Sequence, residues 1–177
     1  MKTLTLLRHA KSDWTDAVRR DFDRPLNERG RRAARTMGAY LAEQGLAFDR
    51  VIASPALRVR DTLDEVARGY GRALDAAFDQ RIYLAPASTL LDLVRETDEE
   101  VERLLLVGHN PGLEELALEM GRADAGSPMR REVEIKYPTA TLAEIALDGA
   151  AWRDAAEGRI VRFVRPRDLD PELGPDA

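Results

Sequence analysis

The two histidines of the sequence occupy equivalent positions, each just after a short apolar run. His9 follows Thr3–Leu7, and His109 follows the fully apolar stretch Leu104–Val107. Such runs are typical of buried strands, and ligands of open α/β sheets bind beyond the carboxyl ends of the strands. A lone histidine at a strand end is usually a hydrogen-bonded surface residue. The equivalent placement of both instead predicts that the two imidazoles meet at one ligand-binding edge.

Two arginines, Arg8 and Arg58, are expected near the same edge, and Arg24 is a candidate for a third. Arg8 directly precedes His9, and Arg24 lies in the loop that follows the first strand. Arg58 falls in the first turn of the helix predicted after the strand Arg50–Ala53. Guanidinium groups bind phosphate oxygens through two parallel hydrogen bonds. A neutral imidazole can attack phosphorus, and a second, protonated imidazole can stabilise charge on the phosphoryl oxygens. The set therefore predicts a phosphoryl-transfer site.

Several other kinds of site are excluded or disfavoured by the sequence. It contains no cysteine, which excludes cysteine phosphatases, disulfides and thiolate metal sites. No P-loop, dinucleotide-binding or nucleophile-elbow motif is present, so Ser54, which precedes Pro55, is expected to be a helix N-cap. A zinc site would need carboxylates beside the two histidines, and no H-E-x-x-H motif suggests one. We expect neither a metal nor a cofactor.

Strands and helices alternate through most of the chain. Asn27 is expected to cap a helix that begins at Glu28, and Asn110 with Pro111 predicts another helix start. This alternation predicts an α/β fold with a largely parallel sheet, in which the last two strands could pair antiparallel. The predicted strands are Thr3–Leu7, Arg50–Ala53, Ile82–Leu84, Leu104–Val107, Thr141–Leu147 and Arg159–Val164.

Length and charge limit the class of protein. The 177 residues predict one domain over residues 1–165 and a flexible C-terminal tail over 166–177, which is rich in proline and acids. The formal net charge of −5 disfavours a general nucleic-acid binder. No apolar run approaches the roughly 20 residues that span a bilayer, and Met1–Leu7 lacks the features of a signal peptide. We therefore expect a cytoplasmic protein without membrane contact.

Four blocks of the sequence, in order along nearly the whole chain, match the motifs of a known family. They are Arg8–Ser12, Asp23–Gly30, Ser54–Arg58 and Val107–Gly112. The chain thereby resembles the histidine phosphatase superfamily, and within it the small SixA-type phosphohistidine phosphatases. One Arg-His pair would be weak evidence, but four ordered blocks are specific. The resemblance implies a phosphoglycerate-mutase-like fold, which is a three-layer α/β/α architecture with a mostly parallel central sheet.

The resemblance also implies roles for individual residues. His9 corresponds to the nucleophile that becomes phosphorylated, and Arg24 matches an arginine that can reach the same pocket. Ser12 and Asn110 lie in the matching blocks and are candidate substrate-binding residues. Inorganic phosphate or its analogues should bind in this pocket. The residues expected to form the phosphate pocket itself are Arg8, Arg58 and His109.

The sequence shows no residue that can be matched to the proton donor of related enzymes. Asn110 stands where acid phosphatases of the superfamily carry an aspartate, although Asp13, Asp16 or Asp23 could supply an acid after folding. A departing imidazole needs less acid assistance than a departing alkoxide. This favours a metal-independent phosphatase that hydrolyses protein phosphohistidine through a phospho-His9 intermediate. The alternatives are a small-molecule phosphomonoesterase and, in another class, a phosphoprotein-binding module with little turnover.

Overall fold

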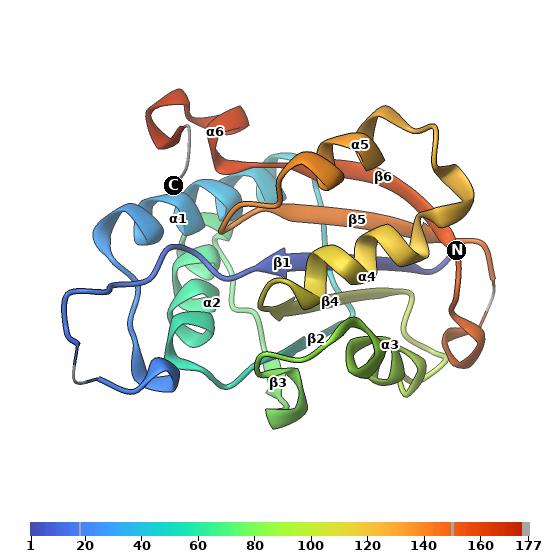
Figure 1. Cartoon of the computed structure of the whole chain (residues 1–177), viewed down its shortest axis with the longest axis horizontal. Coiled ribbons are helices and arrows are strands. Elements are labelled where there is room, and N and C mark those ends of the chain that lie inside the picture. The colour runs from blue at the N-terminus through green and yellow to red at the C-terminus, as the bar shows by residue number, and fades with distance from the viewer. Residues whose placement is uncertain (18, 150, 175–177) are drawn as a thin grey trace.

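A six-stranded mixed β-sheet forms the centre of the protein (Figure 1). The computed structural model describes residues 1–17, 19–149 and 151–174. The strands are β1 (Thr3–Arg8), β2 (Arg50–Ala53), β3 (Ala76–Phe78), β4 (Arg103–Gly108), β5 (Leu142–Leu147) and β6 (Gly158–Val164). The α-helices are α1 (Glu28–Glu43), α2 (Leu57–Tyr70), α3 (Ala87–Arg95), α4 (Gly112–Met120), α5 (Pro128–Ile135) and α6 (Pro166–Leu169). The 3₁₀ helices are η1 (Asp21–Asp23), η2 (Gln80–Ile82), η3 (Arg122–Asp124), η4 (Trp152–Asp154) and η5 (Pro171–Leu173).

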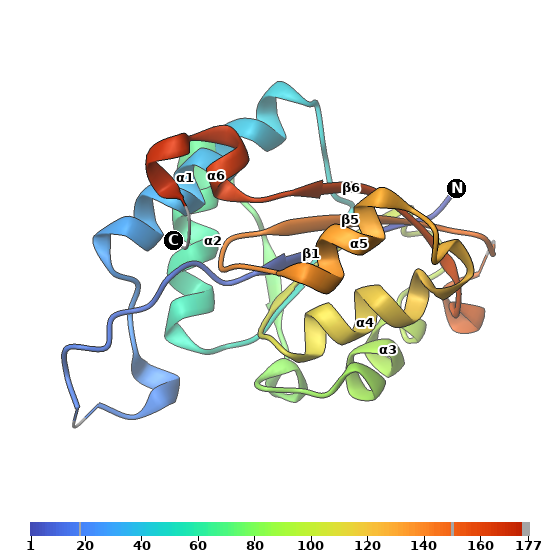
Figure 2. The same ribbon diagram turned by 45° about the horizontal axis from the view of Figure 1, so that its top comes forward.

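Helices cover both faces of the sheet (Figure 2). The strand order is β3-β2-β4-β1-β5-β6, with the first four strands parallel and β5 and β6 each antiparallel to its preceding neighbour. Helices α1, α2 and α6 pack on one face, whereas α3, α4 and α5 pack on the other. This three-layer arrangement confirms the predicted fold class and the antiparallel pairing of the last two strands. None of the described helices is long and apolar enough to cross a membrane.

The central strands are apolar on both faces because both faces are covered. In β4, Leu104 and Leu106 pack into the cluster beneath α3 and α4, while Leu105 and Val107 pack into the cluster beneath α1 and α2. Successive side chains of a strand point to opposite faces, so a strand between two helical layers has no polar face. This explains why Leu104–Val107 is an uninterrupted apolar run in the sequence.

The carboxyl ends of three parallel strands are level with one another. Arg8 at the end of β1 pairs with Gly108 at the end of β4, and Ala53 at the end of β2 pairs with Val107. The amide of His9 donates to the carbonyl of Gly108 at 3.1 Å, which continues this pairing one residue beyond the strand. The residues that follow these strands therefore emerge side by side at one edge of the sheet.

The structure differs from the sequence-based prediction at several element boundaries. Helix α2 begins at Leu57 rather than directly after Ser54, and α4 begins at Gly112 after a cis Asn110–Pro111 peptide bond. The strand predicted at Ile82–Leu84 is wrong. The chain there forms η2 and a turn, and the sheet instead gains β3, which precedes it. Helix α5 was not predicted, although Ser127 caps it and proline occupies its first position.

Residues 166–174 fold against α1, which differs from the flexible tail that the sequence predicts. They form α6 and η5, and Leu173 is fully buried in the cluster beneath α1 and α2. Arg32 of α1 makes ion pairs of 2.6 Å with both Asp170 and Glu172. The rest of the predicted tail, residues 175–177, lies outside the described residues. No local pattern could predict these ion pairs, because Arg32 lies 138 residues before Asp170 and 140 residues before Glu172.

Candidate active site

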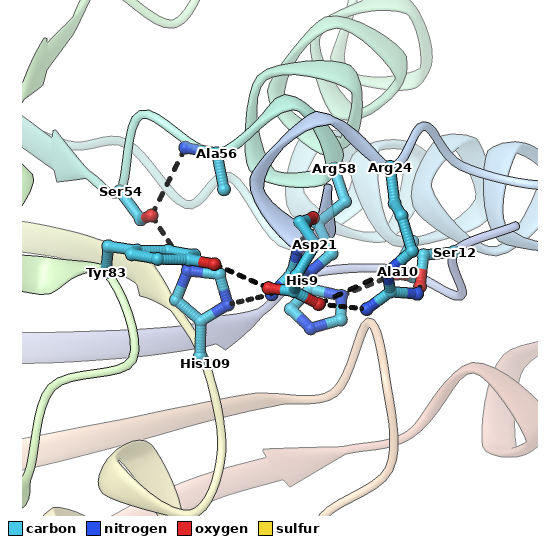
Figure 3. A network of polar contacts seen from close by, with 10 residues as sticks. All are labelled: His9, Ala10, Ser12, Asp21, Arg24, Ser54, Ala56, Arg58, Tyr83 and His109. Carbon is cyan, nitrogen blue, oxygen red and sulfur yellow. Dashed lines mark hydrogen bonds and ion pairs between the residues drawn. The ribbon is translucent and has the colours of Figure 1, made fainter. Parts of the chain in front are cut away.

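A cavity of about 420 Å³ opens at the carboxyl edge of the parallel strands. It brings together all the site residues predicted from the sequence, namely Arg8, His9, Ser12, Arg24, Arg58, His109 and Asn110. Other residues that the sequence analysis did not single out for this site also line it, namely Lys11, Trp14, Asp21, Leu84, Lys136, Pro138 and Thr139. Figure 3 shows the polar network at its base.

His9 is held as a neutral ring with one free nitrogen lone pair. Its Nδ1 lies 2.7 Å from the carbonyl oxygen of Ala10. A carbonyl can only accept, so Nδ1 carries the proton and Nε2 is left unprotonated. Burial, which leaves the residue 8% exposed, lowers the pKa of His9 well below its ordinary value, although the Ala10 carbonyl opposes this shift. The ring is therefore a ready nucleophile at neutral pH.

The backbone after His9 is fixed to helix α2 and to the start of α1. The amide of Ala10 donates to Thr62 Oγ1 at 2.9 Å, and the Thr62 hydroxyl donates to the Arg58 carbonyl at 2.6 Å. At Gly30 of α1 a Cβ atom would lie 2.1 Å from the carbonyl oxygen of Lys11, so only glycine allows this close approach. These contacts fix the backbone immediately after His9.

His109 is also neutral, and it carries its proton on the opposite ring nitrogen. Its Nδ1 lies 3.3 Å from Arg58 Nη2, and its Nε2 lies 2.8 Å from Ser54 Oγ. A guanidinium can only donate, so Nδ1 accepts and Nε2 holds the proton. Burial and the charge of Arg58 lower the pKa of His109 to about 3. His109 is thus neutral in this geometry, whereas the sequence analysis considered a protonated second imidazole that hydrogen-bonds phosphoryl oxygens.

Ser54 supports His109 rather than capping a helix. The residue is completely buried, and its Oγ accepts from His109 Nε2 and, at 3.3 Å, from the amide of Ala56. A hydroxyl before a proline is a common pattern at helix starts, and it suggested an N-cap here. Helix α2 begins three residues later, without a side-chain cap. The hydrogen-bond partner of Ser54 is His109, which lies 55 residues further along the chain, so no local sequence pattern could predict this contact.

Arg58 is the most buried guanidinium of the pocket, at 2% exposure. Its Nη1 donates to the main-chain oxygen of Asp21 at 2.8 Å, and its Nη2 donates to the Asp21 carboxylate at 3.0 Å as well as to His109. Arg8 lies nearby and donates from Nη1 to the carbonyl of Tyr137 at 2.9 Å. The Nε atoms of Arg8 and Arg58 are both buried without a hydrogen-bond partner. Such unsatisfied donors fit a pocket that receives an anion.

Asp21 is a site residue that the sequence analysis missed. Its carboxylate accepts from Arg24 Nη2 at 2.8 Å, from the Tyr83 hydroxyl at 2.6 Å and from Arg58 (Figure 3). Partial burial acts in the opposite direction, but the hydrogen bonds from Tyr83 and Arg24 and the charge of Arg58 hold the pKa of Asp21 well below its usual range. Asp21 is therefore ionised in the unliganded pocket.

The three aspartates that the sequence suggested as acids lie outside the cavity. Asp16 and Asp23 make exposed ion pairs with Arg19 and Arg20 respectively, and Asp13 accepts from the amide of Thr15. All belong to the same loop as Asp21. Nothing in the local pattern distinguishes Asp21 from them, because two of its partners, Arg58 and Tyr83, lie on helix α2 and in the loop after β3.

Arg24 reaches the pocket, as the sequence analysis proposed, and it does so with three partners. The residue is 6% exposed and donates from Nη1 to the hydroxyl of Ser12. Its guanidinium also stacks on the indole of Trp14, 3.4 Å from the ring centroid. Stacking and the ion pair with Asp21 fix the plane of the guanidinium, which suits recognition of an oxyanion.

Asn110 lines the cavity but its amide is engaged with backbone groups. Its Nδ2 donates to the carbonyl of Tyr137 at 3.2 Å, and its Oδ1 accepts from the amide of Glu114 at 3.3 Å. An amide has no acidic proton, so Asn110 cannot act as a general acid. Its contacts indicate that it positions the start of α4 against the loop before β5.

The cavity therefore has the features of an anion site, with a neutral imidazole beside it. Arg8, Arg24 and Arg58 supply positive charge, and His9 offers a free Nε2. Across residues 1–17, 19–149 and 151–174, no group of three histidine, aspartate or glutamate side chains could hold a metal ion. The arrangement suits attack of an imidazole on the phosphorus of a bound phosphoryl group, with charge stabilised by the guanidinium groups.

Comparisons with known proteins agree with this geometry. A family model described as the Histidine phosphatase superfamily (branch 1) matches residues 4–82. An uncharacterised protein of Mycobacterium tuberculosis is 32% identical over 164 residues, which cover 91% of this chain and 100% of the relative. The solved structure of the "putative phosphohistidine phosphatase SixA" of Agrobacterium tumefaciens is 30% identical, with a TM-score of 0.79 over 93% of this chain and 98% of its own. A protein histidine phosphatase SixA complexed with tungstate shares the fold, with 22% identity and a TM-score of 0.77 over 95% of this chain and 99% of that one.

Proposed function

This chain belongs to the histidine phosphatase superfamily and is a phosphatase, and we propose that it hydrolyses protein phosphohistidine through a covalent phospho-His9 intermediate. The observation that carries this proposal is the hydrogen bond from His9 Nδ1 to the Ala10 carbonyl, which leaves Nε2 free for attack. The reaction needs no metal in this proposal, because Arg8, Arg58 and Arg24 supply the positive charge around the phosphoryl group.

The proposed reaction has two displacement steps at phosphorus. In the first, the Nε2 lone pair of His9 attacks, the bond between phosphorus and the substrate imidazole breaks, and the departing nitrogen takes a proton from solvent. In the second, water attacks the phosphorus of phospho-His9, the Nε2–P bond breaks, and phosphate leaves. Arg58, whose Nη2 is held 3.3 Å from His109 Nδ1, stabilises the charge on the transferring oxygens with its guanidinium group.

The shortage of general acids supports an imidazole leaving group. Asp21 lines the pocket but is held ionised, and Asn110 offers an amide. An alkoxide leaving group would depart poorly without a positioned acid, whereas imidazole is protonated near neutral pH. The name of the Agrobacterium tumefaciens relative, which is 30% identical, supports the same substrate class.

The mouth of the pocket supports a substrate that is presented on a protein. Trp14 is 72% exposed and Leu84 is 55% exposed, and both line the cavity. Leu84 also has a φ of 51°, a left-handed conformation that leucine rarely adopts. Exposed apolar side chains at the cavity mouth favour contact with a partner that is larger than a free phosphate ester.

The test is a comparison of substrates in the presence of EDTA. We expect kcat/KM for a phosphohistidine-bearing phosphotransfer protein to exceed that for phosphoserine or a sugar phosphate by at least about tenfold. The His9→Ala variant is the control and should release no phosphate from any of them. A clear preference for an alkyl phosphate would favour a small-molecule phosphomonoesterase. Activity lost in EDTA and restored by one metal would contradict a metal-independent reaction.

A further inference from the structure

Asp21 occupies the hydrogen-bond donors that a bound phosphoryl group would need. Its Oδ1 accepts from Arg24 Nε at 3.2 Å and from Arg24 Nη2 at 2.8 Å. Its Oδ2 accepts from Arg58 Nη2, and its main-chain oxygen accepts from Arg58 Nη1. Two buried arginines of an anion pocket are thus already paired with an anion that belongs to the protein.

Asp21 does not need two buried arginines to stabilise its charge. Its side chain is 43% exposed, so water could solvate the carboxylate. Asp23 of the same 3₁₀ helix, for comparison, pairs with the exposed Arg20. Tyr83 adds a further donor at 2.6 Å and packs edge to face against His109, with the ring centroids 5.4 Å apart. The loop before α1 and the loop after β3 therefore meet at this carboxylate, beside the two arginines.

We propose that Asp21 is a specificity-determining residue, a resident counter-anion that weakens the binding of free phosphate and other small oxyanions in the pocket. For turnover, weaker phosphate binding would mean faster release of the product, and this part of the proposal rests on the proposed function. The binding effect itself requires only that the anion pocket and Asp21 share Arg24 and Arg58.

The physical reason is repulsion between two anions that share the same cations. A tetrahedral dianion must approach Arg24 and Arg58 beside a carboxylate that is ionised, since the pKa of Asp21 lies well below its usual range. Asp21 itself is 43% exposed, but the two guanidinium groups that the anions would share are less than 10% exposed, where water screens charges poorly. A pocket without this carboxylate would retain its product more tightly.

The experiment measures tungstate binding by calorimetry, above neutral pH and without any turnover. Asp21→Asn keeps an oxygen acceptor for Arg24 but removes the charge, and Asp21→Ser provides a second variant if the first does not fold. Asp23→Asn is the matched control, because it removes a carboxylate of the same 3₁₀ helix that pairs with an exposed arginine. Inorganic phosphate serves as the second probe.

We expect Asp21→Asn to bind tungstate and phosphate at least about tenfold more tightly than the unmodified protein, and Asp23→Asn to bind them unchanged. Unchanged or weaker binding in the Asp21 variants would overturn the proposal and would identify the carboxylate as a positioning group for the arginines. No tungstate binding by any variant would also overturn it. A negative result in the phosphohistidine assay would contradict the proposed function, but it would not affect the comparison of oxyanion binding between the variants.

Discussion

His9 and His109 lie with their ring centroids 5.3 Å apart and their planes inclined at 56°, and they carry their protons on opposite nitrogens. The Ala10 carbonyl fixes the proton of His9 on Nδ1, whereas Arg58 fixes that of His109 on Nε2. The two neighbouring imidazoles are therefore not equivalent. One offers Nε2 to a substrate, and the other already uses Nδ1 to hold the arginine.

Replacement of the proposed nucleophile tests the covalent step. We expect His9→Ala to lower kcat/KM by more than about 10³-fold, because no other free imidazole nitrogen lines the described part of the pocket. Rapid quenching of a reaction with labelled phosphoprotein should trap acid-labile, base-stable label on His9 of the unmodified protein. Circular dichroism should show an unchanged fold. Turnover near the normal rate in this variant would exclude the mechanism.

A charge-conserving change at Arg58 tests whether the shape of the guanidinium matters. Lysine carries its three donors on one nitrogen, so it cannot reproduce the planar fork in which the two Nη atoms of Arg58 donate to Asp21 and His109. We expect Arg58→Lys to lower kcat by about 10²- to 10³-fold, the loss typical of an oxyanion donor. Arg60→Lys is the matched control on the same helix, since Arg60 is exposed, and it should keep full activity. Equal effects of the two changes would contradict the assigned role.

The hydrogen bond between Ser54 and His109 predicts a loss of stability. Ser54→Ala leaves the Nε2–H group of His109, which is 3% exposed, without an acceptor. We expect the free energy of unfolding to fall by about 1–3 kcal/mol, measured by urea denaturation. Ser88→Ala, at an exposed position of α3, should change it by less than about 0.5 kcal/mol. A stability loss no larger than that of the control would show that water replaces the hydroxyl.

Acidification should destabilise the protein through its buried neutral histidines. The pKa of His109 falls from 6.5 in the unfolded chain to about 3 in the folded protein, mainly because of burial, and that of His9 is lowered in the same direction. The unfolded state therefore binds more protons below pH 6.5, so the stabilisation is complete above this pH and declines as the pH falls toward 3. Each histidine should contribute a loss of about 1.4 kcal/mol per pH unit well below pH 6.5. Chemical denaturation from about pH 7 down to about pH 5 should show the slope rising toward this value, and His109→Asn should reduce it by roughly half. An unchanged slope in His109→Asn would indicate that this ring is protonated in the folded protein.

The part of the site that the sequence could predict is the part attached to the sheet. Arg8, His9 and His109 follow apolar runs, and parallel strands of one sheet end at the same edge, so their meeting follows from topology. Arg58 could be placed because it lies one residue into the helix after β2. These positions depend on local patterns and on one general rule of sheet architecture.

The residues that were missed depend on contacts between distant segments. Asp21 is bound by Tyr83, 62 residues further along the chain, and Ser54 by His109, 55 residues further along. The pattern of a hydroxyl followed by proline starts a helix at Ser127 but not at Ser54, because only Ser54 meets a buried imidazole. Strand β3 was missed because three residues are too few for a period to show.

The pairing of β1 with β4 sets the distance between the two histidines through the number of residues in each strand. Arg8 is opposite Gly108, so each histidine follows its strand by the same single step. Insertion or deletion of one residue within either strand would shift one imidazole by about 3.3 Å along the sheet and turn it toward the opposite helical layer. Substitutions that keep these strands apolar leave the spacing intact. The protein should therefore tolerate apolar substitutions in β1 and β4 far better than insertions or deletions.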